Sequence, residues 1–160
     1  MPLPAHPRIA FLASPVPEAR QLLRHLGYGA TLGSGRWHRM SPRMLVYAGA
    51  TRALCHLEKR VHCNGVQPVH QAMFRLTLPE GAPIQRASDL GLKADWRDDV
   101  AHTQALGMAW LDAEDSLGLW VPSFVVNGDF NLLINPYHEA YRLMAVVVEE
   151  FPFQLDGRLF

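Results

Sequence analysis

Three side chains with chemically different ends lie within one short stretch of this sequence. Arg36 follows a glycine, Tyr47 ends a short apolar segment, and Glu58 lies further along. A guanidinium binds anions such as phosphates through paired hydrogen bonds, an aromatic ring stacks on flat ligands, and a carboxylate accepts hydrogen bonds from sugar hydroxyls. A burial pattern alone does not require these three residue types. The stretch from Gly35 to His62 is therefore the first candidate for a ligand site.

The residues around these side chains predict a strand, a turn and a helix. Met44 to Tyr47 is apolar and strand-like, and Thr51 is suited to cap a helix that runs to about His62. The offsets predict an inward apolar stripe made of Leu54, Leu57 and Val61. Glu58 lies next to this stripe, so we expect it to be partly buried. A buried carboxylate is costly unless it is paired, hydrogen-bonded or used in chemistry.

Each of these three residues also has a purely structural interpretation. Arg36 could form a surface ion pair, and Tyr47 could be a core strand residue with its hydroxyl at the rim. Glu58 could pair with Lys59 or Arg60 on the helix surface, although its position next to the apolar stripe argues against this.

Two polar residues later in the chain are further candidates. The segment Leu119 to Val126 predicts a strand interrupted at Pro122, which implies a strand start, an edge or a bulge. A bulge would turn Ser123 toward a site, whereas a serine that satisfies the backbone there is the alternative. Asn135 is a candidate for ligand binding as well, but an asparagine before a proline often only shapes a turn.

Composition narrows the class of protein. The chain has 160 residues and a formal net charge of zero from 15 basic and 15 acidic residues, which argues against a broad nucleic-acid footprint. No apolar run reaches the length of a membrane span. Cys55 and Cys63 would lie about two turns apart on one helix, too far for a disulfide, which favours the cytosol. The spacing of cysteines and histidines matches no zinc signature, so we expect no metal.

The remaining pattern predicts one α+β domain spanning residues 1–160, with a central sheet of short strands and flanking helices. The other predicted strands are Arg8 to Ala13, Val69 to Leu78, Asn131 to Asn135 and Leu143 to Phe151. The other predicted helices are Glu18 to Leu26 and Asp98 to Asp112, the second packed through Val100, Leu106 and Trp110.

Taken in order, several of these segments resemble the RES domain, the toxin half of Xre-RES toxin–antitoxin modules. The matching segments are Gly35 to His38, Val46 to Ala48, Ala53 to His62, Leu106-Gly107, Trp110-Leu111, Val121 to Ser123, Asn131 to Pro136 with His138, and Phe151 to Phe160. The family is named for an arginine, a glutamate and a serine. These correspond to Arg36, Glu58 and Ser123, with Tyr47 as a fourth site residue.

The resemblance implies a fold similar to the catalytic domains of ADP-ribosyltransferase toxins and an activity on NAD+. Members of the family hydrolyse NAD+, phosphorolyse it or transfer its ADP-ribose to a protein. NAD+ would then be a substrate rather than a bound cofactor, with inorganic phosphate as an alternative co-substrate. The expected roles are pyrophosphate binding for Arg36, stacking for Tyr47, ribose contacts for Glu58, and support for the ligand from Ser123.

The resemblance also implies partners. They are a cognate Xre-type antitoxin that masks the site and contacts DNA itself, and a second toxin copy in a homodimer within that complex. The protein would be cytoplasmic, without membrane or direct nucleic-acid contacts. Two rival functions are a non-catalytic RES-like binding module and an RNA-cleaving toxin. The segment before Gly35 is longer than the family suggests, which leaves the roles of Arg8 and of Glu18 to Leu26 open.

Overall fold

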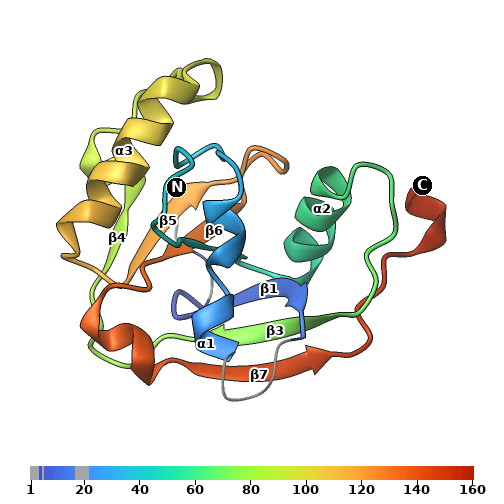
Figure 1. Cartoon of the computed structure of the whole chain (residues 1–160). Coiled ribbons are helices and arrows are strands. Elements are labelled where there is room, and N and C mark those ends of the chain that lie inside the picture. Colours follow the sequence, from blue (N-terminus) through green and yellow to red (C-terminus); the bar gives the residue numbers. More distant parts are fainter. Residues whose placement is uncertain (1–3, 5, 17–21) are drawn as a thin grey trace.

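The computed structural model of the chain describes residues 4, 6–16 and 22–160. Seven strands form one mixed sheet in the order β4-β5-β6-β2-β1-β3-β7 (Figure 1). The strands are β1 (Ile9–Pro15), β2 (Val46–Gly49), β3 (Gln71–Thr77), β4 (Ile84–Arg86), β5 (Gly118–Pro122), β6 (Phe130–Ile134) and β7 (Ala145–Glu150). All neighbouring strands are antiparallel except the β4–β5 pair. The α+β fold class predicted from the sequence is confirmed.

In the described part of the chain, three α-helices and several short 3-10 turns flank the sheet. The helices are α1 (Leu22–His25), α2 (Arg52–His62) and α3 (Val100–Ala113). The 3-10 turns are Tyr28–Thr31, Ala87–Leu90, Trp96–Asp98, Glu139–Leu143 and Gly157–Leu159. Figure 1 shows α3 beside β4 and β5, and α2 above β1, so the two longer helices flank different parts of the sheet. Among the described residues, no helix is both long and apolar enough to cross a membrane.

The sheet has a weak joint between its two halves. Strands β1 and β2 share a single register pair, Phe11 with Gly49, whereas β1 pairs with β3 from Ile9 to Pro15. The sheet therefore consists of one half built from β4, β5, β6 and β2, and another built from β1, β3 and β7. We call the β1–β2 joint the seam. Helix α2 contacts both β1 and β2, so it covers the seam.

Helix α2 begins as predicted, but its buried face differs. The Thr51 side chain accepts a hydrogen bond from the Leu54 amide, which confirms the cap. Leu54 and Cys55 are its buried residues, whereas Leu57 and Val61 are 40% and 54% exposed, so the predicted stripe is confirmed at Leu54 and wrong at Leu57 and Val61. The inward direction runs between Leu54 and Cys55, and Leu57 lies about 110° around the helix from it.

Helix α3 packs tightly against the turn that carries Arg36. A side chain on Gly107 would place its Cβ 1.9 Å from the Trp37 carbonyl oxygen, so only glycine allows this contact. The Thr103 hydroxyl donates to the Arg36 carbonyl at 2.6 Å from the same helix. Leu106 and Trp110 are buried as predicted. Val100 is half-exposed at the start of the helix, so its predicted core role is wrong.

Strand β5 ends at Pro122 rather than continuing to Val126. The Ser123 amide donates to Asp129 next to β6, so the preceding proline nitrogen faces the opposite side. On that side β4 has already ended, at the pair of Arg86 with Trp120. The proline therefore lies at a local edge, where no ladder hydrogen bond is lost.

The structure describes the first predicted strand and only the end of the first predicted helix. Strand β1 confirms the predicted strand from Arg8 to Ala13, and the Arg8 guanidinium donates to the carbonyls of Pro79 and Ala82. Arg8 therefore connects main-chain turns rather than facing a ligand. The predicted helix from Glu18 to Leu26 is described only from residue 22, where α1 begins, and its earlier part lies outside the described residues.

Candidate active site

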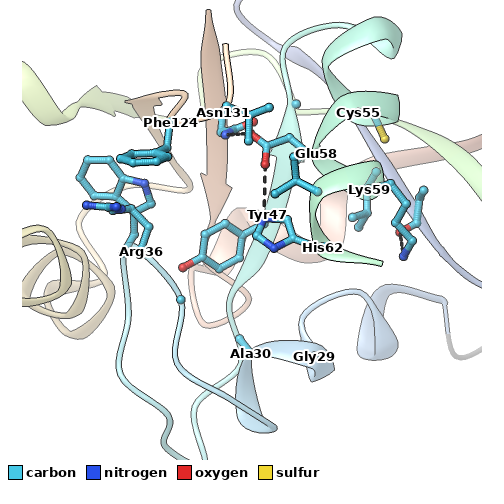
Figure 2. Close-up of a pocket in the computed structure, with 18 of the residues that line it drawn as sticks. Gly29, Ala30, Arg36, Tyr47, Cys55, Glu58, Lys59, His62, Phe124 and Asn131 are labelled. Carbon is cyan, nitrogen blue, oxygen red and sulfur yellow. Dashed lines mark hydrogen bonds and ion pairs between the residues drawn. The ribbon is translucent and has the colours of Figure 1, made fainter. Parts of the chain in front are cut away.

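A cavity of about 660 Å³ opens where α2 covers the seam. Its walls come from the loop 29–38, from β1 and β2, from α2, and from residues 124, 125 and 131. Arg36, Tyr47 and Glu58 all line it, so the structure brings these three predicted side chains together. Figure 2 shows Arg36 beside Phe124 on one side of the cavity and Glu58 with Asn131 and His62 on the other.

The Glu58 carboxylate is held by donors from three different parts of the chain, of which Figure 2 shows Asn131 and His62. Its Oε1 atom accepts hydrogen bonds from Asn131 Nδ2 at 2.7 Å and from Ser123 Oγ at 3.2 Å. Its Oε2 atom lies 3.4 Å from His62 Nε2, one turn further along α2. Because Oε1 accepts from two donors and Oε2 has only the longer contact with His62, Oε2 has more remaining capacity to accept from a ligand.

These contacts keep Glu58 ionised. Burial alone would raise the pKa of the Glu58 carboxyl, but the neighbouring His62 and the hydrogen bonds from Asn131 and Ser123 outweigh it, so that pKa is lowered. The same contact with Glu58 raises the pKa of the His62 imidazole, against a smaller opposing effect of burial. The cavity therefore contains a fixed negative charge whose partial partner, His62, is mostly exposed.

Arg36 is held by carbonyls and an aromatic ring rather than by an acid. Its Nη1 donates to the carbonyl oxygens of Arg97 at 3.0 Å and Trp96 at 3.4 Å, and its guanidinium carbon lies 4.2 Å from the centroid of the Phe124 ring. Within the described part of the chain, no carboxylate lies within ion-pair distance of it. The surface ion pair that was the alternative for Arg36 is absent there, and the guanidinium retains donors for an anion.

Arg97 connects the Arg36 and Glu58 sides of the cavity. Its guanidinium donates to the carbonyl oxygens of Ser123 and Phe124, while its own carbonyl accepts from Arg36. The loop that places Ser123 next to Glu58 is thereby joined to the turn that holds the Arg36 guanidinium.

Tyr47 faces the cavity, and its hydroxyl is occupied by a neighbour. The hydroxyl lies 2.6 Å from His38 Nδ1, and burial raises its pKa well above the ordinary value. In the view of Figure 2, the ring lies between Arg36 and His62. The phenol therefore stays protonated, and its ring is available for stacking.

Ser123 and Asn135 do not line the cavity. Ser123 is buried, donates to Glu58 and accepts from the Val126 amide, so it positions the carboxylate and shapes the loop. Asn135 is fully buried, donates to the Leu111 carbonyl and accepts from the Tyr137 amide. The structure thus gives Asn135 the turn-shaping role that was its alternative, rather than a place in the ligand site.

Sequence reasoning missed several residues of this site. His62 lies four residues after Glu58 on one helix, a spacing that could have indicated a pair. Asn131 and Phe124 belong to the β5–β6 hairpin and its loop, which reach the cavity through the long-range pairing of β6 with β2, and no local signal marks them. Within residues 4, 6–16 and 22–160, no group of three or more His, Cys, Asp or Glu side chains could hold a metal ion.

A profile of the RES domain matches residues 10–156. The chain belongs to this family. It is 32% identical over 136 residues to Toxin Res of Yersinia enterocolitica serotype O:8 / biotype 1B (strain NCTC 13174 / 8081), covering 83% of this chain and 88% of that protein. It is also 33% identical over 117 residues to the Prs ADP-ribosylating toxin of Sphingobium sp. (strain YBL2), covering 70% of this chain and 72% of that protein.

A solved structure shares the fold of this RES domain. It is a chain of the M. tuberculosis MbcT-MbcA toxin-antitoxin complex, with a TM-score of 0.65 over 89% of this chain and 81% of that chain. The two sequences are 16% identical, so the likeness concerns the fold alone.

Proposed function

We propose that this RES domain consumes NAD+ by cleaving the bond between nicotinamide and ribose. The proposal rests on the Glu58 carboxylate, which Asn131, Ser123 and His62 hold in place. The same cavity contains the Arg36 guanidinium, which has no carboxylate beside it in the described residues. A dinucleotide presents a pyrophosphate for the guanidinium and ribose hydroxyls for the carboxylate. The related Prs ADP-ribosylating toxin supports chemistry on the same bond.

The reaction needs little from the protein beyond placement and charge. Nicotinamide leaves as a neutral molecule from a cationic pyridinium, and positive charge develops on the ribose as in an oxocarbenium ion. Glu58 Oε2 would accept hydrogen bonds from the ribose hydroxyls and stabilise that charge. Ser123 and Asn131 would act through Glu58 by fixing its Oε1 atom.

The other side of the cavity would bind the rest of the dinucleotide. Arg36 would hold the pyrophosphate with its remaining donors, and the Tyr47 ring would stack on nicotinamide or its ribose. Water or inorganic phosphate would complete the reaction as acceptor. A protein side chain is the second candidate acceptor, favoured by the name of the Sphingobium relative.

We also propose that the protein acts as a cytoplasmic toxin that depletes NAD+ and is neutralised by an Xre-type antitoxin. Several relatives are named Toxin Res, and the MbcT-MbcA structure is a toxin-antitoxin complex. The antitoxin would cover the cavity and would make any contact with DNA. The toxin would form a homodimer within that complex.

The first test is to incubate the purified chain with NAD+, with and without inorganic phosphate, and to identify products by mass. ADP-ribose would establish hydrolysis, and its 1″-phosphate would establish phosphorolysis. Glu58→Gln is the matched control, since it keeps an acceptor for Asn131 and Ser123 but removes the charge. Unchanged NAD+ under both conditions contradicts these two activities. In expressing cells, stable NAD+ with degraded RNA would instead support the RNA-cleaving rival.

A further inference from the structure

His38 is a buried side chain that the proposed chemistry does not use. It is 5% exposed and lines the cavity between Tyr47 and the glycine-rich loop, residues 27–35. Its Nδ1 atom lies 2.6 Å from the Tyr47 hydroxyl. Its Nε2 atom lies 3.0 Å from the Ala30 carbonyl oxygen and 2.8 Å from the Gly33 carbonyl oxygen. Both ring nitrogens therefore contact groups that form the cavity wall.

These contacts assign the hydrogen on the ring. Carbonyl oxygens only accept, so Nε2 must carry a hydrogen to satisfy Ala30 and Gly33. No carboxylate in the described part of the chain pairs with His38, and a buried charged ring without such a partner would be costly. With hydrogen on Nε2, a neutral ring has its lone pair on Nδ1, where it accepts the Tyr47 hydroxyl hydrogen. Burial, which raises the pKa of that hydroxyl, keeps the hydrogen in place.

The packing leaves this pair little freedom. A Cβ atom on Gly35 would lie 2.9 Å from His38 Cε1 and 2.9 Å from the Tyr47 hydroxyl oxygen, so the main chain closes directly over the hydrogen bond. A side chain at position 35 would therefore have to displace His38 and Tyr47. The loop, His38 and Tyr47 form one connected wall of the cavity.

We propose that His38 is a positioning residue for substrate binding, which in its neutral form with hydrogen on Nε2 connects the glycine-rich loop to Tyr47 and fixes the orientation of the Tyr47 ring. This inference rests on the proposed NAD+ activity for its functional consequence. A ring held in one orientation loses less freedom when a flat ligand stacks on it, so binding improves. Because the hydroxyl donates to His38, it is not a proton donor to the substrate. The effect of His38 therefore lies on KM rather than on kcat.

Two substitutions separate the contact of His38 with Tyr47 from its contacts with the glycine-rich loop. The amide of His38→Asn reaches the position of Nδ1 and keeps an acceptor for Tyr47, whereas the amide of His38→Gln reaches the position of Nε2 and keeps a donor for the loop. Losing one hydrogen bond predicts a rise of about tenfold in the KM for NAD+ in His38→Gln, with kcat within about twofold. We expect a smaller rise in His38→Asn. A wild-type KM in His38→Gln, or a fall in kcat alone, would overturn the proposal.

Coupling to Tyr47 gives a second kinetic check. Tyr47→Phe removes the hydroxyl and keeps the ring, so adding His38→Gln to it should raise KM no further. Additive increases in KM would show that His38 acts by another route, and would overturn the proposal.

A substrate-free measurement keeps the test independent of folding defects and of the proposed activity. Nitrogen NMR of histidine-labelled wild-type protein should show one buried neutral ring, assigned to His38 by its loss in His38→Gln, with hydrogen on Nε2. A charged ring, or hydrogen on Nδ1, overturns the assignment. If the ring is as expected but wild-type protein leaves NAD+ intact, the proposed function fails. NAD+ titration calorimetry then decides whether His38→Gln weakens binding about tenfold.

Discussion

The Glu58 and Arg36 sides of the cavity are built in opposite ways. Glu58 contacts donor side chains at both carboxylate oxygens, and these come from α2, β6 and the turn after β5. Arg36 contacts main-chain carbonyls and the face of Phe124, with no carboxylate beside it in the described residues. The Glu58 carboxylate is thus fixed by side-chain donors, whereas the Arg36 guanidinium keeps N–H donors that no acid occupies.

Under the proposed function, this difference assigns the chemical step to the Glu58 side and substrate binding to the Arg36 side. Charge that must meet a developing cation works best when it is already oriented, because no reorganisation is then needed in the transition state. Charge that must meet a ligand anion works best when its donors are not already satisfied by an acid. The comparison predicts that changes around Glu58 lower kcat and that changes around Arg36 raise KM.

The largest expected effect is that of Glu58→Gln. The amide keeps an oxygen acceptor for Asn131 and Ser123 but removes the negative charge, so kcat should fall by about a thousandfold. The thermal melt should stay cooperative, since the packing is retained. NAD+ turnover and a melting curve on the same sample check this. Loss of activity together with loss of the melt would leave the fold, not the charge, as the cause.

Arg36→Ala should come next, and its effect should appear in KM. Losing charge-assisted hydrogen bonds to a phosphate predicts a rise of roughly 30-fold in the KM for NAD+. Arg36→Lys should recover only part of this, because an ammonium cannot form the paired contact. Full kinetic curves for both variants check the prediction. A fall in kcat at unchanged KM would contradict the prediction that the Arg36 side of the cavity acts on substrate binding.

Asn131→Ala tests how far Glu58 depends on being held. Its hydrogen bond to Oε1 is the shorter of the two, so its removal should lower kcat by about tenfold. Ser123→Ala removes the longer bond and should lower kcat by about threefold. Comparing the two variants at saturating NAD+ checks the order. The reverse order would mean that Ser123 acts on the ligand or the loop more than on Glu58.

The smallest expected effect is that of His62→Ala, and it depends on pH. The lowered pKa of Glu58 contributes stability above its ordinary value of 4.5, which is lost as pH falls through the folded-state value. The raised pKa of His62 contributes stability below its ordinary value of 6.5, which is lost as pH rises through the folded-state value. The pair therefore stabilises the fold between these two folded-state values.

Because the His62 side chain is 73% exposed, solvent screens this pair, and the loss in His62→Ala should be only about 0.5 kcal/mol at mildly acidic pH. The difference from wild type should shrink as pH rises above the raised His62 pKa. The acid limb of kcat/KM should also move to higher pH, because Glu58 loses a group that lowers its pKa. Denaturant melts and rate profiles across pH check both. A deficit that grows in alkaline solution would contradict the pairing.

The sequence was informative wherever the determining interactions were local. Thr51 caps α2 through an amide three residues away, and Arg36, Tyr47 and Glu58 line one cavity as their spacing suggested. The face of α2 could not be predicted in the same way. The offsets of Leu57 and Val61 fit an apolar stripe, but the direction of the core depends on how α2 sits over the seam.

The support for the site is long-range, which is why it was not predicted. Asn131 and Ser123 reach Glu58 from 73 and 65 residues away, through the pairing of β5 with β6 and of β6 with β2. His38 reaches Tyr47 through a turn whose closure depends on Gly35. Neither contact follows from the periodic spacing of residues along a helix or a strand, so a single sequence does not reveal it.

The order of the strands has a consequence for synthesis on the ribosome. Strand β2 is the next strand after Arg36 in the chain, but its partner in the first half of the sheet, β6, is made more than 80 residues later. A growing chain that has passed His62 but not Ser123 contains the Glu58 carboxylate without two of its three hydrogen-bond or ion-pair partners, Ser123 and Asn131. Translation that stops in that interval yields a fragment without an assembled site, so the proposed activity is expected only from chains that extend beyond Asn131.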